Sequence, residues 1–197
     1  MLSQQDTYTT EADYLQWEAR QPARHEYIGG QIHAMTGATL RHNVIVVNII
    51  AALRPHLRAT PCRAFVEAVK LRVARNSAIY YPDVLVSCDK RLQDISAGQH
   101  LVEEATVVIE VLSESTEGID RREKLNAYRT LAELKEYVLV SQNDIKIEIY
   151  RRQGDIGWEL ITLEPGDPFE LKSLNFSMPI EEVYAETGCG PVRDPAG

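Results

Sequence analysis

The chain has 197 residues and a mass of 22.2 kDa, which suits one ordinary domain and is too short for two full ones. Lysine and arginine number 21 against 29 aspartate and glutamate residues, so the formal net charge is −8. That balance excludes a histone-like protein, which holds nucleic acid by bulk positive charge. Apolar residues make up 44% of the chain and charged residues 25%, as in a globular protein with a core.

Cysteine is scarce: Cys62, Cys88 and Cys189 include no CxxC pair. We therefore expect neither a disulfide framework nor a structural zinc site, and we interpret Cys62 and Cys88 as small buried apolar residues. Residues 44–53, the longest uncharged apolar stretch, are about half of a membrane span. The N-terminus lacks the basic and then apolar order of a signal peptide. These features predict a soluble cytoplasmic protein with no membrane partner.

The N-terminal segment predicts a helix followed by a hairpin. Thr10 is a candidate N-cap with Asp13 three residues later, a spacing that favours a helix start. Residues 25–35 form two short runs around Gly29-Gly30. A Gly-Gly pair supplies the positive φ values that a two-residue hairpin turn requires, so we expect a β-hairpin there.

A long helix and two strand candidates follow. Thr39 precedes an apolar-periodic stretch at residues 41–57, which predicts the longest buried helix, bent or ended by Pro55. The period then changes to two, and residues 63–73 and 79–88 are strand candidates rich in β-branched and aromatic side chains.

The second half predicts a buried central strand and its neighbours. Residues 106–112 are nearly all apolar and β-branched, which is typical of a strand covered on both faces. The remaining expectations are a polar loop at 89–104, a helix at 120–131, a buried strand at 136–141, outer strands at 146–151 and 158–162, and a turn-rich tail after 186. A mixed sheet flanked by helices is the simplest fold that accommodates them.

Two carboxylates interrupt strands that are otherwise apolar. Glu110 lies within the run at 106–112, and Asp83 lies within residues 80–86. Burying an unpaired ionised carboxylate costs several kcal/mol. A divalent cation shared by both groups would offset that cost. The alternative is that each acid pairs with a nearby arginine or lies at a strand end.

A helix-spaced triplet follows the second acid. Asp120, Lys124 and Tyr128 are four residues apart, so they stack along one helix face. For Asp120 we favour a structural role, as a capping box with Glu123 or an i,i+4 ion pair. Lys124 is a candidate for the site because its helix starts near the end of the strand that carries Glu110.

Several of these motifs together resemble a known family. YPDV at 81–84, EVLSEST at 110–116 and the D-x-x-x-K-x-x-x-Y spacing at 120–128 are similar to the Uma-two endonucleases, a branch of the PD-(D/E)XK or restriction-endonuclease-like superfamily. The hairpin at 25–35 and His42 also resemble that family. The resemblance implies an α/β (α+β mixed) fold, with a central mixed sheet, flanking helices and an N-terminal helix and hairpin. It covers nearly the whole chain: a nuclease-like domain at residues 1–185 and a flexible tail at 186–197.

The resemblance also implies which residues act. Asp83 matches the "PD" acid and Glu110 the "(D/E)" acid. The superfamily's usual lysine position is Leu112 here, so the lysine function is assigned to Lys124, with Lys70 as the rival. Asp83, Glu110 and the carbonyl of Val111 would hold Mg²⁺ or Mn²⁺.

Further residues are weaker candidates for the active site. Glu26 would reach the metal or its water shell, or else be an exposed hairpin acid. His42 would contact phosphate or transfer a proton, or else cap or pack the helix. Tyr128 would orient Lys124, or else belong to the core. Arg121 and Arg122 are candidate phosphate contacts.

The function implied is metal-dependent hydrolysis of DNA phosphodiester bonds, with a homodimer suited to cutting both strands of a duplex. Two alternatives stand beside it. One is an inactive nuclease-fold interaction module, which Leu112 at the lysine position supports. The other is hydrolysis of small phosphodiesters, which the charge of −8 suits better.

Overall fold

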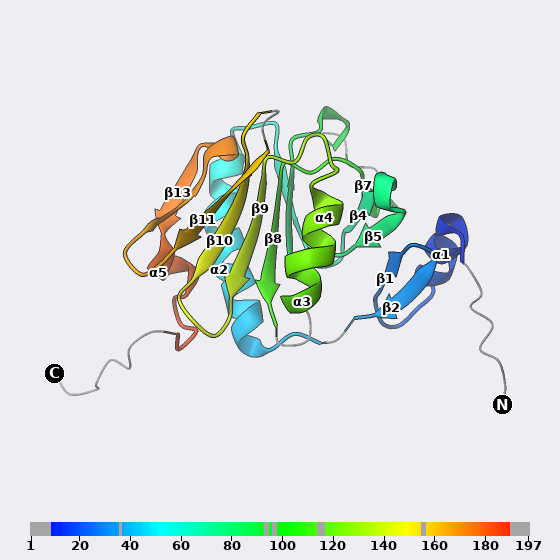
Figure 1. The fold of residues 1–197 in the computed structure, drawn as a ribbon, viewed down its shortest axis with the longest axis horizontal. Coiled ribbons are helices and arrows are strands. Elements are labelled where there is room, and N and C mark those ends of the chain that lie inside the picture. The colour runs from blue at the N-terminus through cyan, green and yellow to red at the C-terminus, as the bar shows by residue number, and fades with distance from the viewer. Residues whose placement is uncertain are drawn as a thin grey trace.

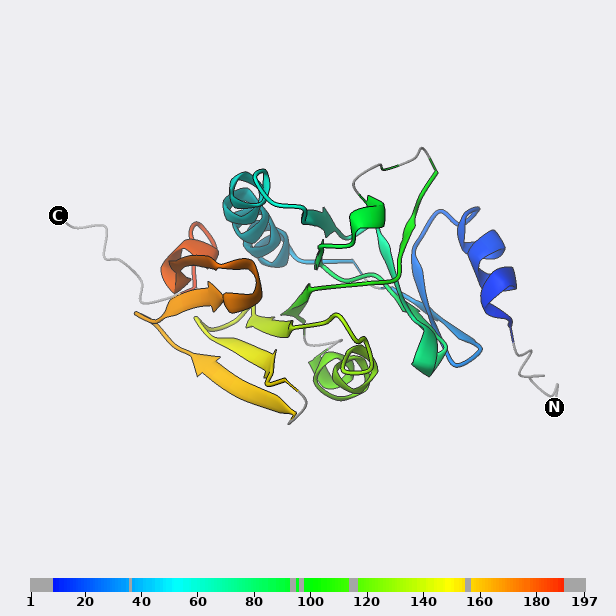
Figure 2. The same ribbon diagram turned by 90° about the horizontal axis from the view of Figure 1, so that it is seen from above.

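The computed structural model describes residues 9–189, except 36, 93–94, 96–97, 114–116 and 155–156. The described elements form two larger β-sheets, with helices on both faces of the six-stranded one (Figures 1 and 2). The predicted mixed α/β class is confirmed. Among the described residues, no helix combines the length and apolar character needed to cross a membrane.

The six-stranded sheet is mixed. Its spatial order is β11 (Trp158–Leu163), β10 (Ile147–Arg152), β9 (Glu136–Ser141), β8 (Val107–Leu112), β6 (Val84–Ser87) and β3 (Arg63–Val66). β8 and β9 run parallel, and the other neighbours run antiparallel. Every residue of β8 is buried, as its unbroken apolar run predicts.

Alternation along β8 directs its side chains to two different helices. α2 (Leu40–Leu57) covers one face of the sheet, whereas α3 (Glu117–Ile119), a π-helical turn (Asp120–Lys124) and α4 (Leu125–Tyr128) cover the other (Figure 2). Ile109 belongs to the same core cluster as the buried side chains of α2, while Val108 and Leu112 share a cluster with those of α4. Because successive strand residues point to opposite faces, Glu110 faces the α4 side.

The observed boundaries of α2 agree closely with the predicted ones, whereas those of the helix after β8 agree less closely. Thr39 caps α2 by accepting a hydrogen bond from the His42 amide, 3.1 Å away, and Pro55 lies two residues before the end of this helix. By contrast, the helix expected at 120–131 begins at Glu117 and ends at Tyr128.

The N-terminal elements build the second sheet. Thr10 caps α1 (Glu11–Glu18), and the predicted hairpin is β1 (His25–Ile28) and β2 (Gln31–Ala34), with φ of 56° at Gly29 and 94° at Gly30. The strand order is β2, β1, β5 (Ala78–Tyr80), β4 (Lys70–Val73) and β7 (Leu101–Val102). β7 lies in the segment expected to be a loop.

The two long strands expected at 63–73 and 79–88 are each broken in the middle. β3 pairs with β6 in one sheet, whereas β4 pairs with β5 in the other. The strand expected at 63–73 is broken at Glu67, whose φ of 46° is left-handed. The strand expected at 79–88 is broken at Pro82, which has no N–H to donate to a ladder. The result is one long ribbon bent between two sheets, and the Glu67 amide donates to the Asp83 carbonyl across the bend at 3.3 Å.

The expectation that Cys62 and Cys88 are unpaired is wrong. They form a disulfide, because the antiparallel register pairs Arg63 with Ser87 and so brings the flanking cysteines opposite each other. Cys189 is free. The scarcity of cysteine therefore gives no support for a reducing compartment.

The C-terminal elements had no counterpart among the expected ones. β12 (Pro168–Leu171) and β13 (Phe176–Pro179) form a small sheet, and α5 (Ile180–Val183) packs its apolar side chains into the same core as α2. At the start of the expected flexible tail, Thr187 is buried and its carbonyl accepts from Arg41. Residues 190–197 lie outside the described residues.

Candidate active site

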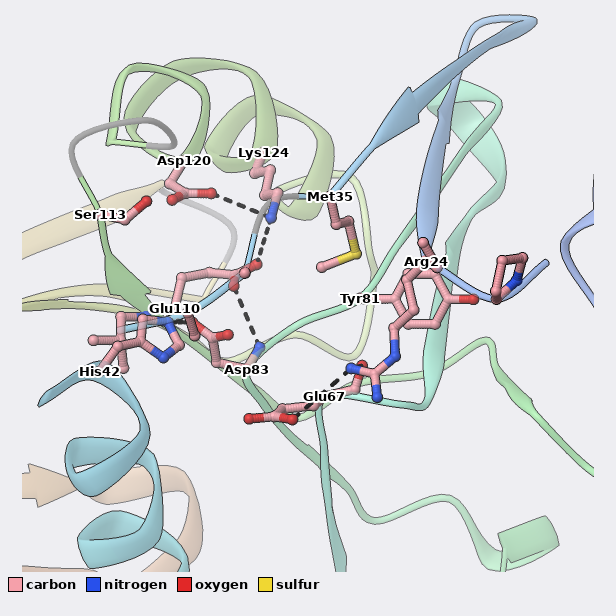
Figure 3. Close-up of a pocket in the computed structure, with 15 residues that line it drawn as sticks. Arg24, Met35, His42, Glu67, Tyr81, Asp83, Glu110, Ser113, Asp120 and Lys124 are labelled. Carbon is pink, nitrogen blue, oxygen red and sulfur yellow. Dashed lines mark hydrogen bonds and ion pairs between the residues drawn. The ribbon is translucent and has the colours of Figure 1, made fainter. Parts of the chain in front are cut away.

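A cleft of about 400 Å³ lies at the bend of the ribbon (Figure 3). The ribbon, the end of β8, the start of α2 and the π-helical turn all contribute to it. The side chains in its wall are mostly polar or charged, and they include Arg24, Met35, His42, Glu67, Tyr81, Asp83, Glu110, Ser113, Asp120 and Lys124.

The two acids that interrupt the strands meet in this cleft. Pairing between β6 and β8 begins at Val84 and Ile109, so Asp83 and Glu110 lie together where the ladder ends. The Asp83 amide donates to Glu110 Oε2 at 3.3 Å. No arginine forms an ion pair with either carboxylate among the described residues. The alternative that each acid is neutralised by a nearby arginine is therefore wrong.

Asp83 is held from β8 and from α2. Its Oδ2 accepts a hydrogen bond from the Val111 amide at 2.7 Å and lies 3.1 Å from His42 Nε2. Burial lowers the pKa of His42, but the hydrogen bond and the negative charge of Asp83 outweigh burial, so the net pKa is above the ordinary value of 6.5. His42 is thus both a buried helix residue and a member of the site.

Glu110 is more deeply enclosed than Asp83. The Glu110 side chain is 4% exposed and the Asp83 side chain 18%. Glu110 Oε1 accepts from Lys124 Nζ at 3.2 Å and from the Tyr128 hydroxyl at 3.0 Å. Burial raises the pKa of Glu110 well above its ordinary value; the Lys124 charge opposes this rise.

Lys124 is surrounded by carboxylates from three elements. Its Nζ lies 3.1 Å from Glu26 Oε1, 3.2 Å from Glu110 Oε1 and 3.2 Å from Asp120 Oδ1. Burial lowers the pKa of Lys124, but these three charges outweigh it and the net pKa lies well above its ordinary value. Lys124 therefore stays cationic.

Two of the structural alternatives are wrong. Glu26 is not an exposed hairpin acid, because it is buried, accepts from the Tyr81 amide at 3.2 Å and pairs with Lys124. Asp120 does not cap the helix, because the helix begins at Glu117; the other structural role expected for it, an i,i+4 ion pair with Lys124, is confirmed. Asp120 instead lies buried in the π-helical turn, a rare conformation that is frequent at functional sites.

Tyr128 combines both of the roles considered for it. Its ring is fully buried in the core between Tyr80 and Tyr137, and its hydroxyl contacts Glu110. The acid, not Lys124, is therefore its polar partner.

The other basic candidates lie away from the acids. Lys70 is not among the described residues that line the cleft; its Nζ lies 5.3 Å from the centroid of the Tyr81 ring. Arg121 forms ion pairs with Glu117 and Glu148, which leaves less of its charge for a phosphate. Arg122 is exposed on the helix and is also absent from the described lining.

The donor atoms in the cleft suit a hard divalent cation. Mg²⁺ is typically bound through one or two carboxylates with several waters retained, and Asp83 and Glu110 supply two carboxylates beside the main chain of Val111. Lys124 and His42 form ion pairs with four acids, namely Glu26, Asp83, Glu110 and Asp120. Negative charge is therefore in excess in this cluster unless protons or a bound cation balance it. Among the described residues, no three His, Cys, Asp or Glu side chains are arranged to hold a metal by themselves, so waters or substrate would complete the coordination.

Sequence reasoning missed Glu67 and Arg24. Both line the cleft, and Arg24 Nη1 donates to the Glu67 carbonyl at 3.3 Å. Arg24 directly precedes β1 and Glu67 lies in the bend between β3 and β4, and no local pattern marks either residue. Residues 114–116 of the EVLSEST motif lie outside the described residues.

Comparisons with known proteins bear on the family and the fold of this chain. Residues 11–181 match the family model described as "Uma2: Putative restriction endonuclease". Two Synechocystis proteins, "Uncharacterized protein slr1290" and "Uncharacterized protein sll1609", are 36% and 34% identical to this chain. These alignments cover 87% and 83% of this chain and 89% and 91% of the relatives.

A solved structure shares the fold. It is the crystal structure of "a putative nuclease belonging to DUF820" from Anabaena variabilis, with a TM-score of 0.73 and 17% sequence identity. The match covers 89% of this chain and 97% of that one.

Proposed function

This chain belongs to the Uma2 family of restriction-endonuclease-like proteins, and on that premise we propose that it is a metal-dependent nuclease that hydrolyses phosphodiester bonds in DNA. The observation that carries the proposal is the meeting of Asp83 and Glu110 in one cleft, beside Lys124 and with no described arginine in an ion pair with either acid.

In the proposed reaction Asp83 and Glu110 hold the cation. A bound divalent ion supplies an activated water and neutralises charge that develops on the phosphate. Asp83 is the more open ligand, and its orientation is fixed by the Val111 amide and by His42. The Val111 carbonyl would be a third oxygen donor.

Lys124 supplies the positive charge of the site. It pairs with Glu110, and its charge favours the anionic form of this carboxyl against the burial that raises its pKa. Because Lys124 also lines the cleft, its ammonium orients the attacking water or contacts the scissile phosphate. His42 contacts the other acid, Asp83, and acts by holding that carboxylate or by moving a proton.

Plasmid cleavage tests the proposal directly. Wild-type protein is incubated with plasmid and Mg²⁺ or Mn²⁺, and a parallel reaction contains EDTA in place of the metal. The test variant is Asp83→Asn, and the control variant is Asp144→Asn in an exposed loop. We expect nicking or linearisation that needs the metal, that Asp144→Asn retains, and that Asp83→Asn reduces roughly 10²–10³-fold.

Two results would overturn this assignment. Cleavage by pure Asp83→Asn protein at the wild-type rate would place the reaction elsewhere. Absence of cleavage together with absence of Mg²⁺ or Mn²⁺ binding, measured by calorimetry on the wild type, would instead match an inactive interaction module. Cleavage of small phosphodiesters in preference to plasmid would change the substrate class.

A further inference from the structure

A second hollow of about 690 Å³ lies along the exposed edge of the six-stranded sheet. β3 is the last strand on that side of the sheet, and the end of α2 forms the opposite wall. Its apolar floor includes Phe65, Val66 and Val69. The groove is bordered by three arginines, Arg54, Arg58 and Arg63.

No acid among the described residues neutralises these arginines. No Asp or Glu lines the groove within the described residues, and none of the three arginines forms an ion pair there. The side-chain donations of Arg63 within the described part of the chain go to the carbonyls of Thr60 and Cys62. Elsewhere in the described chain, other arginines form ion pairs with carboxylates. These are Arg24, Arg72, Arg91, Arg121 and Arg151.

Another groove on the molecule gives the contrast. It has Arg72, Arg75 and Arg91 in its wall, but also Glu103, Glu104 and Glu133. In a chain with a net charge of −8, a groove with three arginines and no lining acid concentrates positive potential locally.

The dipole of α2 does not account for the whole cluster. Arg54 and Arg58 lie at the C-terminal end of the helix, where cations are stabilised by the macrodipole. Arg63 lies on β3, and it extends the positive charge onto the sheet edge.

The basic groove is continuous with the candidate active site along the chain. Val66 and Val69 line the groove, and Glu67 between them lines the cleft. His42, in the first turn of α2, lines the cleft, and Arg54 and Arg58 follow 12 and 16 positions later. At about 1.5 Å of rise per residue, this separation is roughly 18–24 Å. A DNA duplex covers that distance in roughly five to seven base pairs.

We propose that Arg54, Arg58 and Arg63 form a track for the phosphate backbone of a DNA strand that enters the cleft. The proposal rests on the proposed nuclease function, because it names where the substrate of that site extends. The contacts position the backbone and do not read bases.

Salt-dependent binding tests the track. Anisotropy of fluorescein-labelled DNA, duplex in one arm and single-stranded in the other, is measured in EDTA between about 50 and 200 mM NaCl. The test variant is Arg54→Gln/Arg58→Gln. The control is Arg20→Gln/Arg91→Gln, which removes the same charge from exposed positions outside the groove.

We expect the test variant to bind on the order of tenfold more weakly than the control. Its plot of log affinity against log salt should be less steep by about 1.8 for a duplex or about 1.4 for a single strand. A slope change close to the value for one form of DNA, with no change for the other form, identifies the form that uses the track. Arg63→Gln should reduce the slope by roughly half as much.

The outcomes separate this inference from the proposed function. A test variant that matches the control in affinity and slope overturns the track, even if the wild type cleaves plasmid. Wild-type protein that binds neither form of DNA also overturns it. Loss of slope in the test variant supports the track even where metal-dependent cleavage is absent, a result that would count against the nuclease function alone.

Discussion

The two lysines considered for the site lie over neighbouring tyrosine rings. Lys124 Nζ is 5.6 Å from the Tyr80 centroid, and Lys70 Nζ is 5.3 Å from the Tyr81 centroid. Three carboxylates surround Lys124, whereas no carboxylate forms an ion pair with Lys70 among the described residues.

Their pKa values move in opposite directions. Burial lowers the pKa of Lys70, with only partial compensation from Glu18. Burial also lowers the pKa of Lys124, but Glu110, Glu26 and Asp120 reverse the effect. The comparison teaches that the charge of a buried lysine depends on the acids that other elements bring to it.

The largest expected effect comes from Lys124→Met. This change leaves three buried carboxylates without their cation, so we expect a loss of about 3–5 kcal/mol in the free energy of unfolding at neutral pH. Cleavage should fall as well. Urea unfolding followed by circular dichroism measures the stability.

The pH dependence of this loss has a defined sign. The folded pKa of Glu110 is already above its ordinary value of 4.5, and removal of Lys124 raises it further. When the pKa of a carboxyl group is higher in the folded state, its contribution to the stability of that state is fully present below its unfolded pKa. This contribution is lost as the pH rises through the folded pKa. The defect should therefore shrink as the pH falls through the raised folded pKa of Glu110 and be smallest below pH 4.5.

Lys70→Met is the matched control for this comparison. It removes a cation–π contact and no ion pair, so its effect should stay within about 1 kcal/mol. Equal defects in the two variants would show that the acids around Lys124 do not distinguish the lysines. Loss of turnover in Lys70→Met, with Lys124→Ala fully active, would reverse the assignment of the catalytic lysine.

A smaller effect is expected from Tyr128→Phe. The ring keeps its packing against Tyr80 and Tyr137, while Glu110 loses one donor. A hydrogen bond to a charged group contributes about 1.5–3 kcal/mol, and the unfolding free energy should fall by that amount. A double-mutant cycle with Glu110→Gln measures the coupling, which should be near zero if the hydroxyl contacts a group other than Glu110.

The smallest expected effect concerns His42 and Asp83. In metal-free wild type the His42 pKa should exceed 6.5, and in Asp83→Asn it should fall because burial remains while the negative charge is gone. The pair should stabilise the fold below pH 6.5 and lose that contribution as the pH rises through the folded pKa. NMR titration of the imidazole checks both values, and an unchanged pKa in Asp83→Asn would contradict the contact.

Local patterns predicted the elements whose cause is local. Thr10 and Thr39 cap helices, and Gly29-Gly30 turns a hairpin, because these residues act on backbone within a few positions. The run from Val107 to Leu112 became the buried β8 because an unbroken apolar run suits a strand covered on both faces.

Non-local pairing decided what the patterns missed. Period-two alternation continued through Glu67 and Pro82, so it gave no sign that each long strand would divide between two sheets. The Cys62–Cys88 bond depends on the register of β3 and β6. The position of Glu26 in a hairpin predicted a solvent-exposed acid, whereas in the structure the ribbon and the π-helical turn enclose it.

The sequence by itself determined that Asp83 and Glu110 need compensation, since each interrupts an apolar strand, and that Lys124 and Tyr128 share a helix face. Only the tertiary structure decided what surrounds them, since the distances that set pKa values and ion pairs join residues up to about a hundred positions apart in the chain. A carboxylate in an apolar run indicates a desolvation energy that must be offset, but its partner is fixed by the folding of remote elements against it.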